Sequence, residues 1–257
     1  MSYRAALASL FMIAAVHGTA QAAPVADYSV KFNSQFDASA HPELGLVNAD
    51  VTAGGLQTHG FYNDQGVASQ ITLNASGILA SAGDYTIDLD FGGVASTRWT
   101  VKLLDFYGQS QNSGLYIDNH NISFYDNEGN PTRGSSALIQ DDAAFSVTLS
   151  RSSATSTVTG YINGVQQFSF LDALGLATFN PLQFFIFTDD VVTPGSGGDA
   201  YESRAGLIKG ISVYQTALSA GDVASLHNVS MVPEPEGWAL ALGGLLACGV
   251  LSRRRRA

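Results

Sequence analysis

Apolar and polar residues alternate in short runs along the central part of the chain, which is the pattern of half-buried β-strands. The clearest run covers residues 85–91, where Tyr, Ile, Leu and Phe fall on one face while Asp88 and Asp90 fall on the other. Similar runs cover residues 28–36, 99–106, 115–117, 122–125, 145–149, 158–162, 165–170 and 207–214. The last run is expected to be another strand, with Leu207 buried.

Turn and helix signals complete the prediction of an all-β domain. Asn163-Gly164 separates two of the runs, and Asn-Gly is a preferred two-residue hairpin turn because both positions accept a positive φ. Residues 184–187 form a short continuous apolar run, which is typical of a central strand. Ser219 followed by Asp222 is a capping box that predicts one short helix reaching Leu226. Many short strands without long helices predict a sandwich or barrel.

The two ends of the chain carry processing signals. Residues 1–22 have a basic start at Arg4, an apolar centre over residues 7–16 and the small-x-small sequence Ala20-Gln21-Ala22. This is the pattern of a secretory signal peptide, which predicts use of the Sec translocon and cleavage by signal peptidase before Ala23. Its apolar centre is too short for a membrane-spanning helix.

The last twenty-six residues consist of three parts in order. The first part is a stiff, extended motif, because each proline fixes φ and pushes the residue before it toward extended geometry. An uncharged apolar stretch from Trp238 to Leu251 follows, about 21 Å long as a helix. The motif is Val232, Pro233, Glu234 and Pro235, and the basic cluster that ends the tail is Arg253, Arg254, Arg255 and Arg256. A plain C-terminal membrane anchor is the alternative interpretation.

This tail resembles the PEP-CTERM sorting signal of Gram-negative bacteria. The resemblance implies recognition and cleavage near the motif by an exosortase, after a transient association of residues 232–257 with the inner membrane. It also implies that the mature chain, residues 23–231, reaches the cell surface or the extracellular space of a bacterium that makes an exopolysaccharide matrix.

Charge excludes one class of partner for this mature domain. Removing Arg4, the four terminal arginines, Glu234 and Glu236 from the 12 basic and 22 acidic residues leaves 7 and 20, a net charge of −13. Such a surface repels nucleic acid and favours cations. The single cysteine, Cys248, lies in the tail, so the mature domain has no disulfide.

Two segments of the domain carry a second resemblance. Residues 161–168 (Tyr-Ile-Asn-Gly-Val-Gln-Gln-Phe) and 205–214 (Ala-Gly-Leu-Ile-Lys-Gly-Ile-Ser-Val-Tyr) resemble a hairpin and the closing strand of laminin-G-like and concanavalin A-like domains. The resemblance implies a jelly-roll sandwich of two antiparallel sheets. That superfamily contains lectins, adhesion modules and glycosidases, so the fold leaves the function open.

A candidate Ca²⁺ site follows the apolar run at residues 184–187. Asp189 and Asp190 are adjacent carboxylates, and a Gly-rich loop over residues 194–198 leads to Glu202. Ca²⁺ takes six to eight oxygen ligands, including backbone carbonyls, and Asp105 is expected to approach from a neighbouring strand. A solvated acidic loop without a metal is the alternative.

The chemistry of the mature domain favours binding over catalysis. It contains no G-x-S-x-G elbow, phosphate loop or thiol nucleophile, its histidines have no metal-ligand spacing, and it has three glutamates. We therefore expect a non-catalytic carbohydrate-binding or matrix protein. Tyr62, Tyr107, Tyr116 and Tyr125 are candidates for stacking on sugars, although scattered tyrosines in β-domains more often lie at the edge of the core. The alternative is a glycoside hydrolase of the concanavalin A-like superfamily that uses Asp88 or Asp90, although an outward solvated face is the favoured interpretation of this pair.

Overall fold

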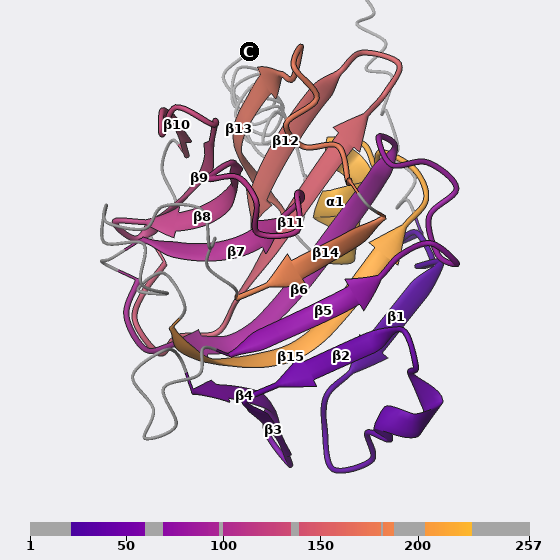
Figure 1. Cartoon of the computed structure of the whole chain (residues 1–257), viewed down its shortest axis with the longest axis vertical. Helices are drawn as coiled ribbons and strands as arrows, with labels where there is room; N and C mark the ends of the chain where they lie inside the picture. The colour runs from indigo at the N-terminus through magenta and orange to yellow at the C-terminus, as the bar shows by residue number, and fades with distance from the viewer. Residues whose placement is uncertain are drawn as a thin grey trace, which may run out of the picture.

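The chain folds into two antiparallel sheets that lie face to face (Figure 1). The computed structural model describes residues 22–59, 69–97, 100–134, 139–180, 182–187 and 204–227. The predicted all-β sandwich is therefore confirmed. The apolar centre of the signal peptide and the whole sorting tail lie outside the described residues. Within the described ranges no helix is long and apolar enough to cross a membrane.

The larger sheet has eight strands and contains most of the predicted ones. In spatial order its strands are β13 (Val165–Leu171), β12 (Thr157–Ile162), β11 (Phe145–Ser152), β6 (Tyr85–Val94), β15 (Ala205–Tyr214), β4 (Gly55–His59) and β3 (Ala49–Thr52). β1 (Tyr28–Lys31) pairs with the second half of β15, beyond the half that pairs with β4. β15 is thus a central strand that pairs with β6 on one side and with β4 and β1 on the other.

The smaller sheet has seven strands. Its spatial order is β10 (Pro131–Arg133), β9 (Asn121–Tyr125), β8 (Gly114–Asp118), β7 (Val101–Asp105), β14 (Gln183–Ile186), β5 (Gln70–Asn74) and β2 (Leu44–Val47). β14 pairs with both β7 and β5, which confirms that the apolar run at residues 184–187 forms a central strand. A 3₁₀ turn, η1 (Ala38–Ala40), lies between β1 and β2.

The core lies between the sheets and follows the alternation in the sequence. On β6 the side chains of Tyr85, Ile87, Leu89 and Phe91 are completely buried, as the period-2 pattern predicts. Strands of the smaller sheet bury Leu115, Ile117, Phe184 and others against them. Aromatic rings fill one end, where Phe91 stacks on Phe145 with centroids 4.8 Å apart.

The predicted turn and helix both form. Asn163 and Gly164 have φ values of 49° and 77°, and they connect β12 to β13 as the hairpin requires. Helix α1 (Ala220–Leu226) begins with a complete capping box, in which Ser219 and Asp222 each bond the other's backbone amide.

The segment that follows β15 folds back across the outer face of the larger sheet. Thr86 on β6 donates from its hydroxyl to the Thr216 carbonyl and accepts from the Leu218 amide, at 2.9 Å each. Ser150 on β11 donates to the Leu218 carbonyl. These outward hydroxyls are thereby satisfied by main-chain groups, and α1 is placed over the same face.

Two details differ from the sequence predictions. The first strand ends at Lys31 instead of continuing to Phe36, because Asn33 turns the chain by accepting from the Gln35 amide with its side chain and from the Phe36 amide with its carbonyl. Leu207 is half-buried beside Gly92 rather than inside the core. A register irregularity in β15 between Leu207 and Gly210 interrupts the alternation, so the inward positions resume at Ile211.

Candidate functional site

The outer face of the larger sheet carries a ladder of polar side chains. On β6 these are Thr86, Asp88 and Asp90, because their neighbours along the strand point into the core. On β11 their direct partners are Ser150, Thr148 and Ser146. The prediction that Asp88 and Asp90 share one outward face is therefore confirmed, and the surface they form continues onto β15 and β1.

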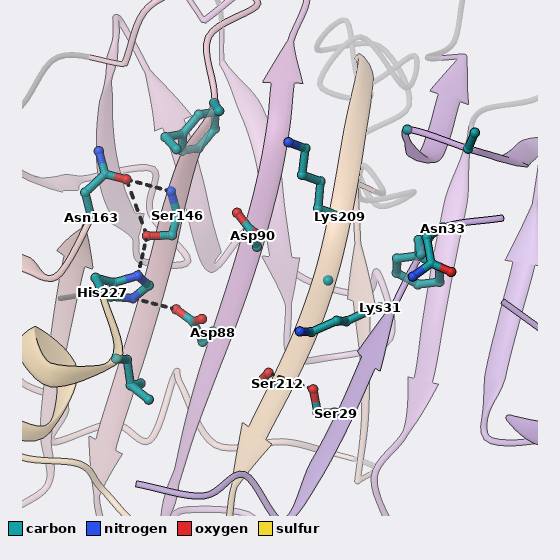
Figure 2. A pocket seen from close by; sticks show the side chains of 17 residues that line it. Ser29, Lys31, Asn33, Asp88, Asp90, Ser146, Asn163, Lys209, Ser212 and His227 are labelled. Carbon is teal, nitrogen blue, oxygen red and sulfur yellow. Dashed lines mark hydrogen bonds and ion pairs between the residues drawn. The ribbon is translucent and has the colours of Figure 1, made fainter. Parts of the chain in front are cut away.

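An open groove lies on this face, with a volume of about 920 Å³ (Figure 2). β1, β6, β11 and β15 contribute to its lining, together with the end of α1. The charged and titratable side chains that line it are Lys31, Asp88, Asp90, Lys209 and His227. Hydroxyl groups supply much of the rest, and Ser29 and Ser212 hydrogen-bond each other across β1 and β15 at 3.2 Å.

Asp88 is fixed by a hydrogen-bond network at the end of the groove beside α1. Its Oδ1 accepts from the Thr148 hydroxyl at 2.6 Å and lies 3.1 Å from Nε2 of His227. Nδ1 of the same histidine lies 3.1 Å from the hydroxyl of Ser146. His227 follows the last residue of α1, so this network also fastens the helix to the sheet.

Asp90 has a different environment, although it lies only two residues along the same strand. Its side chain is exposed in the groove and makes no hydrogen bond with any described residue. Partial desolvation by the surrounding walls raises the pKa of this carboxyl, and the neighbouring Asp88 raises it further. Lys209, His227 and Lys31 oppose that effect from the other strands, and the net shift of the pKa is upward. The groove thus holds one anchored and one free carboxylate.

Two lysines bring positive charge to the same groove. Lys31 ends β1 and Lys209 lies on β15, and both side chains extend from their strands toward β6 in Figure 2. Each is exposed, and no ion pair within 4 Å joins either of them to a described carboxylate. The stem of Lys209 lies over Gly92, so a side chain at position 92 would displace the lysine stem.

This arrangement suits recognition of a polar ligand. The groove presents ammonium donors, carboxylate acceptors, hydroxyls and the amide of Asn163, which are the groups that hydrogen-bond a polyhydroxylated molecule. In the described ranges no three His, Cys, Asp or Glu side chains gather as a metal site would require. The groove is therefore a candidate binding site built from hydrogen bonds and charge.

The predicted calcium ligands are not brought together by the described part of the chain. Asp189, Asp190 and Glu202 lie outside it. Asp105 lies on the outer face of the smaller sheet, where its Oδ2 forms an ion pair of 2.7 Å with Lys102 and both side chains are fully buried. Its Oδ1 accepts from the amides of Tyr107 and Gln109. The chain's own amides thus occupy Oδ1, the ammonium group of Lys102 lies against Oδ2, and the calcium site stays a prediction.

Three of the candidate sugar-stacking tyrosines are described, and each hydroxyl has a partner. Tyr107 donates to the Gly175 carbonyl, Tyr116 donates to the Asn112 carbonyl, and Tyr125 donates to Asp118. Tyr116 is buried against Tyr125, with ring centroids 4.8 Å apart. These rings belong to the packing of the smaller sheet, while Tyr62 lies outside the described residues.

Sequence reasoning missed the lysines and His227. His227 lies 139 residues from Asp88 along the chain, so no local spacing reveals their contact. The lysines could have been found from composition, because the whole chain has three of them. Such scarcity makes the position of each one informative.

Comparisons with known proteins support the fold alone. No protein family profile and no curated protein sequence matches the chain. Among solved structures, the botulinum neurotoxin serotype D ligand binding domain in complex with N-acetylneuraminic acid superposes with a TM-score of 0.52 at 14% identity, over 79% of this chain and 50% of that one. The receptor binding domain of botulinum neurotoxin D gives 0.51 at 16% identity, over 79% and 52%. The corresponding domain of the C/D mosaic serotype also gives 0.51 at 16%, over 79% and 51%.

This chain thus spans about half the length of those neurotoxin domains. At such low identity the likeness establishes a shared β-rich fold and carries no residue from one protein to the other.

Proposed function

We propose that the chain is an exported, non-catalytic carbohydrate-binding protein that acts at the cell surface or in an exopolysaccharide matrix. The observation that carries the binding activity is the groove of Figure 2, where free charged groups and hydroxyls converge on the outer face of a β-sheet. Sugar hydroxyls both donate and accept hydrogen bonds, and this groove offers partners of both kinds. The solved structure that contains N-acetylneuraminic acid shows that a protein with a related fold binds a sugar, which supports the proposal at the level of fold.

A glycan panel probed with the exported protein tests the binding activity. Replacing Asp90 by Ala should abolish or strongly weaken binding, because it removes the free acceptor in the groove without breaking an internal hydrogen bond. Glu128→Ala is the matched control, since it removes an exposed carboxylate from the turn between β9 and β10. Failure of the wild-type protein to bind any glycan, or equal loss in both variants, would contradict the proposal.

The two ends of the sequence support the export route. The order of signal peptide, domain, Pro-Glu-Pro motif, apolar stretch and arginine cluster is the basis for proposing Sec-dependent secretion followed by exosortase processing. The intact mass of the exported protein tests it, and should correspond to a chain that begins at Ala23 and lacks Arg253–Arg256. A mass that includes the arginine cluster would favour a retained membrane anchor.

A second candidate function is glycan hydrolysis by Asp88 and Asp90. The observation that favours it is the unequal pair in one groove, with an anchored carboxylate two residues from one whose pKa is raised. Release of reducing sugar from bound glycans, lost in both Asp88→Asn and Asp90→Asn, would support the enzyme. Binding without any release supports the binder.

A further inference from the structure

Lysine is scarce in this chain, and its few positions are unequal. The sequence contains three lysines, against 22 acidic residues. Lys102 is fully buried in its ion pair with Asp105. The other two, Lys31 and Lys209, both reach the groove on the outer face of the larger sheet. Every exposed lysine of the protein therefore lies beside one site.

The strand register explains how these lysines frame an open floor. Gly210 on β15 pairs with Lys31 on one side and with Asp90 on β6 on the other. Adjacent strands lie about 4.8 Å apart, so Lys31 and Asp90 are separated by roughly 10 Å at their backbones. Gly210 places no side chain between them. Lys209, the residue before Gly210 on β15, extends toward β6 beside this gap (Figure 2).

The carboxylates of the groove leave the two ammonium groups without close partners. Asp88 is held by Thr148 and His227. Asp90 influences both lysines electrostatically, yet no ion pair within 4 Å forms between Asp90 and either of them. Two exposed ammonium groups that no described carboxylate approaches within 4 Å are positioned for an anion that arrives from outside.

We propose that the groove over Gly210 binds an acidic glycan, with its carboxylate or sulfate held by Lys31 and Lys209 and its hydroxyls donating to Asp90. This inference rests on the carbohydrate-binding function proposed above and names the class of its ligand. A neutral glycan would leave both ammonium groups unpaired, whereas an acidic one compensates them. The net negative charge of the domain repels an anionic ligand, and the two lysines offset that repulsion locally at the groove.

Titration of the exported protein with matched polymers tests the proposal. The probes are a polyuronate, its neutral carboxyl-reduced counterpart and a sulfated polysaccharide. We expect an acidic polymer to bind at least about tenfold more tightly than the neutral one, equivalent to about 1.4 kcal/mol. The preference should shrink as salt rises, since exposed charges are screened. The polyuronate and sulfated arms identify which anion the groove takes.

Variants assign the preference to the lysines. Lys31→Gln combined with Lys209→Gln should weaken binding of the acidic polymer about tenfold or more. Ala80→Glu combined with Ala173→Glu lowers the net charge by the same two units at exposed positions outside the groove, and it should leave binding nearly unchanged. Lys31→Arg retains the charge and should retain binding. Coincident thermal melts of these variants would show that the fold is kept.

The outcomes separate this inference from the proposed function. If neutral and acidic polymers bind equally well and the lysine variant matches wild type, the groove is a neutral-glycan site and the inference is overturned while the proposed function stands. If the Ala80/Ala173 variant loses as much affinity as the lysine variant, the effect is long-range charge and the assignment to the groove is wrong. If no glycan of any kind binds, the proposed function falls as well.

Discussion

His227, the residue directly after α1, lies with its Nε2 atom 3.1 Å from the carboxylate of Asp88 at the middle of β6. The contact joins the end of the described chain to a central strand, and both residues line the same groove. Ser146 and Thr148 on β11 complete it. The contacts of His227 therefore both line the groove and attach α1 to the larger sheet.

Removal of this histidine side chain is expected to loosen α1. His227→Ala deletes contacts with Asp88, Ser146 and Thr148, and each hydrogen bond contributes about 0.5–1.5 kcal/mol net. We expect the free energy of unfolding to fall by about 1–3 kcal/mol in denaturant titration. His59→Ala is the control, because His59 makes an exposed contact with Asp50 and should cost less. Equal losses would show that the network contributes no special stability.

The buried pair of Lys102 and Asp105 should respond strongly to loss of one partner. Lys102→Met leaves the carboxylate of Asp105 inside the protein without its cation, which typically costs about 3–5 kcal/mol. Adding Asp105→Asn removes the stranded charge and keeps an oxygen for the amides of Tyr107 and Gln109. The double variant should therefore be more stable than Lys102→Met alone. A double variant that loses the sum of the two single effects would contradict this account of the pair.

The sequence predicts the regular parts of this fold well because they are governed by local physics. Alternation on β6 identifies the buried face, Asn163-Gly164 identifies a hairpin, and Ser219 with Asp222 identifies a helix start. In contrast, β2, β3, β4 and β5 escaped prediction. β3 (ADVT) and β4 (GLQTH) contain few apolar residues, and β2 (LGLV) and β5 (QITLN) each offer only two or three apolar residues between turn-forming segments. Leu207 was placed on the wrong side because a register irregularity is a property of strand pairing and leaves no mark in a single strand.

The candidate site was predicted only in part for the same reason. Asp88 and Asp90 lie on one strand, so their shared face can be read from a period of two. The two lysines that frame the groove come from β1 and β15, and the register through Gly210 brings them beside Asp90. No property of residues 28–31 alone indicates that they pair with residues 210–213. Sites built across strands far apart in sequence require the topology first.

Calcium should stabilise the protein if Asp189, Asp190 and Glu202 hold it as the sequence predicts. At a free concentration one hundred times the dissociation constant, binding to the folded state adds about 2.7 kcal/mol. For a domain of roughly 200 residues this raises the melting temperature by about 5–10 °C. Thermal melts in chelator and in millimolar calcium measure it, and magnesium should do less because it demands octahedral geometry. Asp190→Asn should remove most of the response, whereas Glu128→Gln should not. A response that survives Asp190→Asn would contradict the predicted ligands.

Asp88 and Asp90 should respond to neutralisation with opposite signs. The carboxylate of Asp88 accepts hydrogen bonds that the side-chain amide of an Asn could not fully replace. Asp88→Asn should therefore destabilise the fold at neutral pH. Asp90 makes no such bond with any described residue, and its pKa is raised by partial desolvation in the groove and by Asp88. The folded state therefore binds this proton more tightly than the unfolded chain does. Stability contributed by the protonated form is fully present below the ordinary pKa of 3.8 and is lost as pH rises through the raised pKa.

Asp90→Asn removes the loss of stability that deprotonation of Asp90 causes, so the effect of this variant on the free energy of unfolding should depend on pH. We expect a gain in unfolding free energy at pH 7 of less than about 1 kcal/mol, because solvent screens an exposed carboxylate. The gain should vanish near pH 3, roughly a unit below the ordinary carboxyl pKa. Denaturant titrations of wild type, Asp88→Asn and Asp90→Asn across this range measure both effects. Destabilisation by Asp90→Asn at pH 7 would mean that this carboxylate has a stabilising partner in the protein, and it could not then be the free acceptor that the binding groove requires.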